Sequence, residues 1–215
     1  MYARTPVWIG GGLSEQGTTK IQKLMNKALS GMLIALGAYA YLSIGGIVGA
    51  VLFAFGIVSI VKLGIPLYTG VAGTDEKFHE KLNILLVNIW GAYFMTLLLY
   101  IAAPDALVLK SQEILNNKLD ASVFVTFINA VMCGIIVDIS VFLSKKDNSV
   151  LPLLIGIPLF IISGFNHSIA DVTYISFGFT KDTDFLQVII YYLIVVFGNY
   201  IGCNLRRVSF AVSEK

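Results

Sequence analysis

The segment Ser163-Gly164-Phe165-Asn166-His167-Ser168 lies inside an apolar run that extends over residues 150–177. Glycine and small polar side chains at this position interrupt a helix that would otherwise be long enough to cross a membrane. A second interruption, Leu63-Gly64-Ile65-Pro66-Leu67-Tyr68-Thr69-Gly70, ends the run over 46–66. We therefore expect two broken helices, because the two interruptions occupy equivalent places in the two halves of the chain.

Six apolar runs account for most of the sequence. The 215 residues are 57% hydrophobic and only 13% charged, with a mean hydropathy of +0.82. Soluble domains carry about 25% charged residues, so this composition indicates an all-α integral membrane protein rather than a soluble enzyme. The runs lie at 28–43, 46–66, 83–103, 121–143, 150–177 and 185–204.

One domain accommodates the whole chain. We expect a single transmembrane channel domain over 1–215, with a cytoplasmic N-terminal tail over 1–25 and repeat halves at about 26–103 and 119–207. The net charge of +2 and the absence of a long basic run argue against nucleic acid as a partner. The two cysteines, Cys133 and Cys203, have no metal-ligand spacing, and the sequence predicts no cofactor.

The two halves repeat each other weakly. Gly31 corresponds to Gly134, and Gly91-Ala92-Tyr93 resembles Gly198-Asn199-Tyr200. Three helices followed by three more give the halves opposite orientations in the membrane. This pattern is typical of an inverted 3+3 repeat whose broken helices 2 and 5 meet near the midplane.

The basic residues predict the orientation. Eleven Lys and Arg residues lie on the side of the two termini, against three on the other side. By the positive-inside rule, both termini are expected in the cytoplasm of a multi-pass protein of the cell membrane. The eleven are Arg4, Lys20, Lys23, Lys27, Lys77, Lys81, Lys145, Lys146, Arg206, Arg207 and Lys215; the three are Lys110, Lys118 and Lys181.

His167 is the strongest candidate for a functional residue, with Asn166 beside it. An imidazole at a helix break can donate a hydrogen bond or titrate inside a narrow pore. The alternative is a polar residue that only holds two helices together. The other histidine, His79, lies in a charged loop, so the sequence has no arrangement of nucleophile and base typical of a membrane enzyme.

Three charged residues lie within apolar runs. Asp138 is deep in the fourth run, Asp171 follows His167 by one helical turn, and Lys62 precedes the first break. Buried charges in a membrane are costly and mark ion pathways by default. The alternative is a closed ion pair between Lys62 and one of the aspartates that only stabilises the bundle.

The motif around His167 resembles that of a known family. Gly164-Phe165-Asn166-His167-Ser168-Ile169-Ala170-Asp171 is similar to the Gly-Phe-Glu-His-Ser-Ile-Ala-Asn motif of the formate/nitrite transporter family. Leu67-Tyr68-Thr69-Gly70 resembles that family's Leu-Phe-Thr-Gly loop, and the first and sixth helices also fit. The resemblance implies an aquaporin-like six-helix fold, a homopentamer in the lipid bilayer and one pore per protomer.

The resemblance also implies a pore in which His167 lies between two apolar constrictions, with Thr69 hydrogen-bonding near it. The outer constriction would comprise Phe53, Ile57 and Phe160, and the cytoplasmic one Leu67 and Tyr68. The solute would be a small inorganic or one-carbon ion.

Departures from the motif affect the expected solute. Asn166 replaces the family's glutamate, and Asp138 replaces the asparagine that this glutamate usually faces. The family's vestibule lysines align near Leu151 and Glu15, so fixed positive charge is reduced. Added carboxylates favour cations, and we expect ammonium or ammonia as the solute. The alternative is a formate, nitrite or hydrosulfide channel with proton coupling, supported by Lys62.

Overall fold

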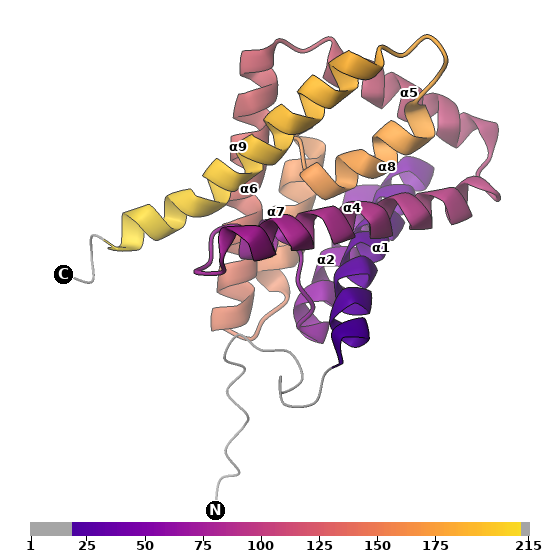
Figure 1. Ribbon diagram of the computed structural model, residues 1–215. Helices are drawn as coiled ribbons and strands as arrows, with labels where there is room; N and C mark the ends of the chain where they lie inside the picture. The colour runs from indigo at the N-terminus through magenta and orange to yellow at the C-terminus, as the bar shows by residue number, and fades with distance from the viewer. Residues whose placement is uncertain (1–18, 212–215) are drawn as a thin grey trace, which may run out of the picture.

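The computed structural model describes residues 19–211, with side chains up to Val208, and this part of the chain is entirely helical (Figure 1). The first eighteen residues, which include Arg4 and Glu15, lie outside the described part. Residues 20–25, predicted as tail, belong instead to the first helix. The helices are α1 (Lys20–Ile44), α2 (Gly46–Leu63), α3 (Tyr68–Val71), α4 (Phe78–Tyr100), α5 (Asp105–Leu119), α6 (Val123–Lys146), α7 (Leu151–Ile162), α8 (Ser168–Gly178) and α9 (Phe185–Ala211).

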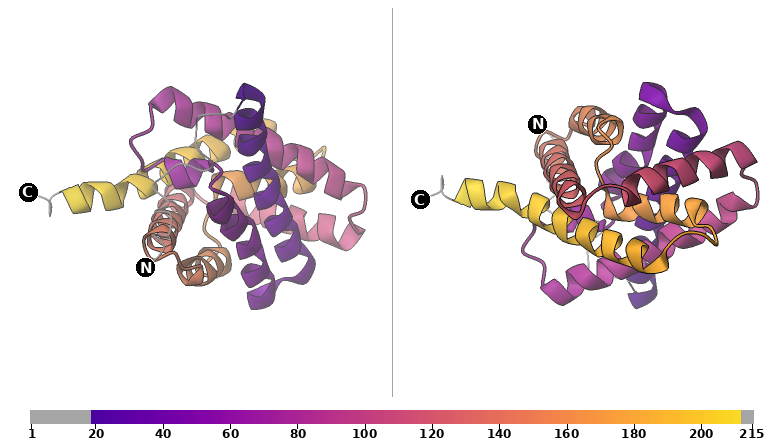
Figure 2. Two further views of the ribbon diagram at one scale, coloured as in Figure 1. Left: turned by 90° about the horizontal axis from the view of Figure 1, so that it is seen from below. Right: turned by 90° about the horizontal axis from the view of Figure 1, so that it is seen from above.

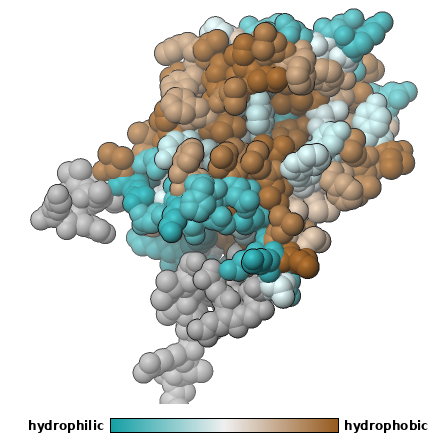
Figure 3. Space-filling view, viewed as in Figure 1, coloured by the Kyte–Doolittle hydropathy of each residue, from teal (hydrophilic) through white to brown (hydrophobic). Residues whose placement is uncertain are grey.

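Five of the helices in residues 19–211 are long and apolar enough to cross a membrane: α1, α2, α4, α6 and α9. The sixth predicted span is present as two pieces, α7 and α8, which flank the second interruption. Hydrophobic side chains cover much of the surface in Figure 3, and hydrophilic ones gather in its lower part and along its upper edge. A wide apolar surface is what contact with lipid or with other membrane subunits requires.

The two interruptions have the same backbone design. Both α2 and α7 are followed by a glycine with positive φ, Gly64 at 66° and Gly164 at 70°. The residue after each glycine donates its N–H to a carbonyl of the preceding helix, Ile65 to Ile60 at 3.2 Å and Phe165 to Phe160 at 3.1 Å. This is the Schellman arrangement, which favours glycine because other residues rarely adopt that conformation.

Two buried asparagines hold the chain after each interruption. Asn88 of α4 accepts a hydrogen bond from the N–H of Tyr68 at 2.8 Å and donates to the carbonyls of Pro66 and Lys27. Asn199 of α9 accepts from the N–H of Ser168 at 2.8 Å and donates to the carbonyls of Asn166 and Ala130. Both side chains are fully buried. Each asparagine therefore satisfies backbone groups that have no helical partner.

Packing repeats between the halves in the same way. α1 packs on α2 and α4 and contacts α8, whereas α6 packs on α7 and α9 and contacts α3. The left view of Figure 2 shows α1 and α2, in indigo, side by side. These matched pairs are what a 3+3 repeat predicts. The alignment of Gly91 with Gly198 is wrong by one helical turn, because Gly91 packs against Ala28 and the equivalent contact to Val131 is made by Gly202.

The helix α5 was not expected from the sequence, which indicated only a connection between the third and fourth runs. It packs on α8 through a buried stripe of Leu107, Ser111 and Leu115. Ser111 donates a hydrogen bond to the carbonyl of Tyr174 at 3.0 Å. Lys118 follows Leu115 by three residues on the same side of the helix, so α5 brings this lysine toward the second interruption.

Truncation of either asparagine should destabilise the fold, because buried backbone groups would lose their partners. We expect Asn88→Ala and Asn199→Ala each to lower the free energy of unfolding by about 3 kcal/mol, at about 1–3 kcal/mol for each unsatisfied group. Thermal unfolding in detergent measures the effect. Asn83→Ala is the matched control on α4, because Asn83 is exposed and accepts only from Lys27. Equal melting temperatures for all three variants would contradict this role.

Candidate functional site around His167

His167 occupies the N-cap of α8 at the second interruption and is fully buried. Its Nδ1 atom accepts hydrogen bonds from the N–H groups of Ile169 and Ala170, at 3.2 and 3.1 Å. A neutral imidazole that accepts at Nδ1 carries its hydrogen at Nε2. That Nε2 atom lies 3.1 Å from Oγ1 of Thr69, which is on α3 after the first interruption. The two interruptions thus meet at this pair of side chains.

Aromatic rings cover His167 on one side. The ring of Phe160 stacks on the imidazole with centroids 5.6 Å apart, and Phe53 contacts Phe160 edge-on at 5.8 Å. Both phenylalanines are buried. The structure therefore brings these two rings together with His167, and their role as a constriction stays a prediction.

Two cavities lie near the interruptions. A cavity of about 120 Å³ reaches His167, Phe160 and Asp171, and it is also lined by Lys118. A second cavity of about 330 Å³ is lined by Leu67 and Ile57. Ile57, which was grouped with Phe53 and Phe160, lies one helical turn from Phe53 along α2 and lines the second cavity. Its part in a constriction stays a prediction. Tyr68 lines neither of these cavities, and its hydroxyl donates to the carbonyl of Val196 at 3.3 Å.

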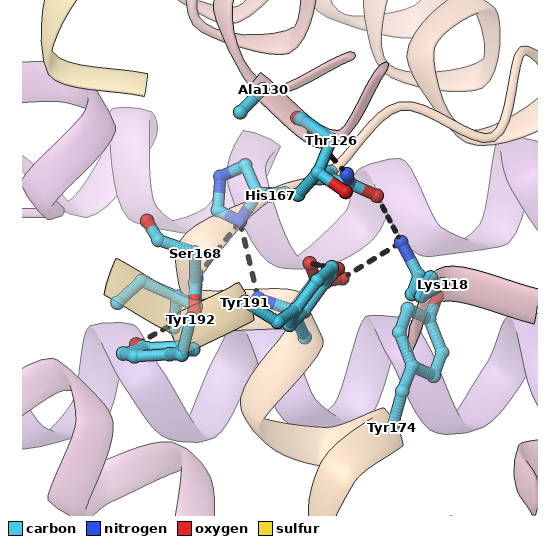
Figure 4. A network of polar contacts seen from close by, with 12 residues as sticks. Lys118, Thr126, Ala130, His167, Ser168, Tyr174, Tyr191 and Tyr192 are labelled. Carbon is cyan, nitrogen blue, oxygen red and sulfur yellow. Dashed lines mark hydrogen bonds and ion pairs between the residues drawn. The ribbon is translucent and has the colours of Figure 1, made fainter. Parts of the chain in front are cut away.

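Lys118, which the sequence did not indicate as a site residue, contacts two residues near His167. Its Nζ donates to Oδ1 of Asn166 at 2.6 Å and lies 3.2 Å from Oδ1 of Asp171 (Figure 4). The ammonium also lies over the ring of Tyr174, 5.8 Å from its centroid. Figure 4 shows Lys118 reaching from α5 toward the residues around His167. Its signal in the sequence was the buried stripe of α5, which gives the segment a helical period.

Asp171 is the best-paired carboxylate of the site. Besides Lys118, the hydroxyl of Tyr191 donates to its Oδ2 at 2.6 Å. Asp171 also lies in the first turn of α8, where the helix dipole stabilises negative charge. The side chain of Lys118 is 13% exposed and that of Asp171 only 1%. Both side chains line the 120 Å³ cavity, and Lys118 is the more exposed of the two.

Asp138 is not part of this cluster. Arg206 of α9 binds it with two hydrogen bonds, from Nε at 2.5 Å and from Nη2 at 3.2 Å, and stacks on Phe142. The prediction that Asp138 faces the position of Asn166 is wrong. Asp138 is neutralised by an arginine that the sequence places 68 residues away, so it adds no unpaired negative charge to a pore.

Lys62 is paired with neither aspartate. Its Nζ donates to Oδ1 of Asn148 at 3.0 Å in an exposed position at the second cavity. The closed ion pair considered as an alternative is therefore wrong as well. The predicted exchange of a carboxylate and an amide between Asn166 and Asp138 is also corrected. Lys118 contacts Asn166 and Asp171 instead. Compared with the family motif, the carboxylate stands at the position of Asp171 and the amide at that of Asn166.

Lys118, Asn166 and Asp171 form a cluster with one ammonium, one amide and one carboxylate. The cluster should tolerate exchange of the amide and the carboxylate, but not a change in its net charge. We expect Asn166→Glu, with two carboxylates, and Asp171→Asn, with none, each to lower stability by about 3 kcal/mol, as for broken buried ion pairs. The double variant Asn166→Glu/Asp171→Asn restores one cation and one carboxylate and should recover most of the loss in thermal unfolding.

The control for an added carboxylate is Asn117→Glu, which changes an exposed position next to Lys118. If the double variant is no more stable than the less stable single variant, the positions of the two side chains, and not the net charge of the cluster, determine the loss of stability.

Comparisons with known proteins all point to formate/nitrite transporters. The Formate/nitrite transporter family model matches residues 9–208. The formate channel FocA of Escherichia coli K12 is 28% identical over 61% of this chain and 53% of its own length. FocA of Haemophilus influenzae is 24% identical over 61% of this chain and 54% of its own. The chain thus spans about half the length of these curated relatives.

Solved structures share the fold. A pentameric formate channel with formate bound superposes with a TM-score of 0.80 at 17% identity, covering 91% of this chain and 98% of that one. A structure described as an FNT family ion channel gives a TM-score of 0.78 at 18% identity, covering 91% and 90%. At these identities the likeness concerns the fold alone.

Proposed function

We propose that this chain, which belongs to the formate/nitrite transporter family, forms a membrane channel for a small monovalent anion of the formate and nitrite type. One observation carries the proposal: the ammonium of Lys118 and the ring of His167 line the same cavity. Both groups are hydrogen-bond donors, and they suit an anion better than a cation.

The ammonium prediction loses its physical basis. It depended on carboxylates that lower the potential near the pore, yet Asp138 is bound by Arg206 and Asp171 by Lys118. The related formate channels also favour the anion alternative. An ion pair cancels most of the field of both partners, so neither aspartate leaves an unpaired negative charge that would favour a cation, and Lys118 remains as a hydrogen-bond donor.

A sequence of interactions describes passage. The anion enters the cavity beside Lys118 and loses part of its water there. It then passes the stacked rings of Phe160 and Phe53, a contact that large hydrated ions cannot cross. There the Nε2–H of His167 exchanges its partner Thr69, at 3.1 Å, for the anion, while the two backbone N–H groups at Nδ1 hold the ring in place.

His167 acts as a neutral donor in this proposal. Two backbone N–H groups point at Nδ1, and both hydrogen bonds would be lost if that atom took up a proton. The ring can hold a hydrogen bond to an anion through Nε2 without changing its charge. Proton coupling, which the family alternative includes, would then require the cap of α8 to open.

The pentameric neighbour supports a proposal for the assembly of the chain, and the distribution of Lys and Arg supports one for its orientation. A solved neighbour is a pentameric formate channel, and the apolar outer surface of α2, α4, α6 and α9 suits both lipid and neighbouring subunits. We propose a homopentamer in the cell membrane with one pore per protomer and both termini in the cytoplasm. No catalytic chemistry is proposed.

A reversal-potential measurement on purified protein in planar bilayers tests the solute. Under a gradient of sodium formate, the potential should approach the equilibrium value for formate, because anions carry the current. Under a gradient of ammonium sulfate, ammonium should give no comparable current. Empty bilayers and bilayers containing protein denatured before reconstitution are the controls. A potential near the ammonium equilibrium value, without formate current, would reverse the assignment.

A further inference from the structure

Two tyrosines line the cavity at the second interruption, and the passage described above does not use them. Tyr41 of α1 and Tyr174 of α8 border this cavity of about 120 Å³ together with Phe160 and His167. Tyr174 is only 5% exposed, so it is not one of the aromatic residues that anchor a membrane protein among the lipid headgroups. Both tyrosines therefore lie where a solute approaches His167.

The hydroxyl group of Tyr174 is open to the cavity and has no protein partner. Neither it nor the hydroxyl of Tyr41 makes a hydrogen bond with another residue in the range 19–208. The buried hydroxyls of this range that are sealed off without a partner are those of Ser144 and Ser168, and Tyr174 is not among them. A buried tyrosine hydroxyl normally finds a hydrogen-bond partner, so this one points to a ligand in the cavity.

Asp171 lines the same cavity but is not the missing acceptor. Its Oδ1 lies 3.2 Å from Nζ of Lys118, and its Oδ2 accepts a hydrogen bond from Tyr191 at 2.6 Å. Both carboxylate oxygens are therefore occupied. An acceptor for the hydroxyl of Tyr174 has to come from outside the protein, as water or as the solute.

One face of α5 holds both tyrosine rings. Lys110, Ile114 and Lys118 follow one another at intervals of four residues, so they lie on one side of the helix. Nζ of Lys110 lies 5.6 Å from the centroid of the Tyr41 ring. Nζ of Lys118 lies 5.8 Å from that of the Tyr174 ring (Figure 4). Cations attract the faces of aromatic rings, so the rings are fixed while their hydroxyls remain available to a ligand.

We propose that Tyr41 and Tyr174 form an oxyanion-binding site, in which the two hydroxyls donate to the two oxygens of an anion such as formate or nitrite. The inference rests on the proposed function and narrows its solute to anions with two acceptor oxygens. Hydrosulfide offers a single sulfur atom, which is a weak acceptor. The site thus favours oxyanions over hydrosulfide before the solute reaches Phe160.

Phenylalanine variants test the site, because they remove the hydroxyl and keep the ring. In proteoliposomes, Tyr41→Phe/Tyr174→Phe should raise the half-saturating formate concentration about tenfold, since two hydrogen bonds to a charged group are lost and water replaces them only in part. The hydrosulfide rate should be the same in the double variant as in the wild type, whatever that rate is, because sulfur gains little from either hydroxyl.

Tyr39→Phe is the matched control, since Tyr39 lies half a turn from Tyr41 on α1, packs on Phe177 and does not line the cavity. Line broadening of carbon-13 formate by detergent-solubilised protein reports binding independently of transport. Loss of broadening in the double variant but not in Tyr39→Phe, with the hydrosulfide rate retained, supports the site.

Failure of the site and failure of the proposed function are distinguishable. A wild type that conducts no formate overturns the proposed function, while the broadening experiment still decides the site. A double variant that matches Tyr39→Phe in both half-saturation and broadening overturns the site and leaves the channel proposal standing. An equal fall of the formate and hydrosulfide rates with unchanged broadening also overturns it, because the tyrosines then only shape the passage.

Discussion

The backbone at membrane depth must find all its hydrogen bonds inside the protein, and two asparagine side chains meet this demand. A bilayer has no water for the N–H and C=O groups that an interrupted helix exposes. Asn88 and Asn199 each accept from the first N–H of a resumed helix and donate to the carbonyl two residues earlier. The interruptions can therefore persist beside lipid-facing helices. The positions of Thr69 and His167 depend on that support.

Pairing of buried charge decides which solute the fold suits. Each buried aspartate of the bundle has its own cation, Arg206 for Asp138 and Lys118 for Asp171. Neither aspartate therefore leaves an unpaired negative charge, and the cavity at the second interruption is lined by Lys118, Asp171 and His167 together. The chain keeps a balanced cluster of lysine, amide and carboxylate while exchanging the positions of the last two. The motif therefore departs from the family at two positions, while one carboxylate and one amide still bind Lys118.

Local features of the fold could be predicted from the sequence, whereas contacts between distant segments could not. Glycine and proline at 64, 66 and 164 indicated the two interruptions, and the motif resemblance indicated that His167, Thr69, Phe53 and Phe160 lie together. Lys118 was missed because α5 is short and polar and was taken as a connection. The partner of Asp138 lies 68 residues away, and no local pattern encodes that distance.

The most direct test of this account is a cryo-electron microscopy map of the protein in lipid nanodiscs with formate. The account predicts interrupted helices held by Asn88 and Asn199, with His167 turned toward Thr69. It also predicts density for a small anion within hydrogen-bonding distance of Nε2 of His167 or Nζ of Lys118. Continuous helices through residues 64 and 164, or an imidazole that faces lipid with no anion density near Lys118, would contradict it.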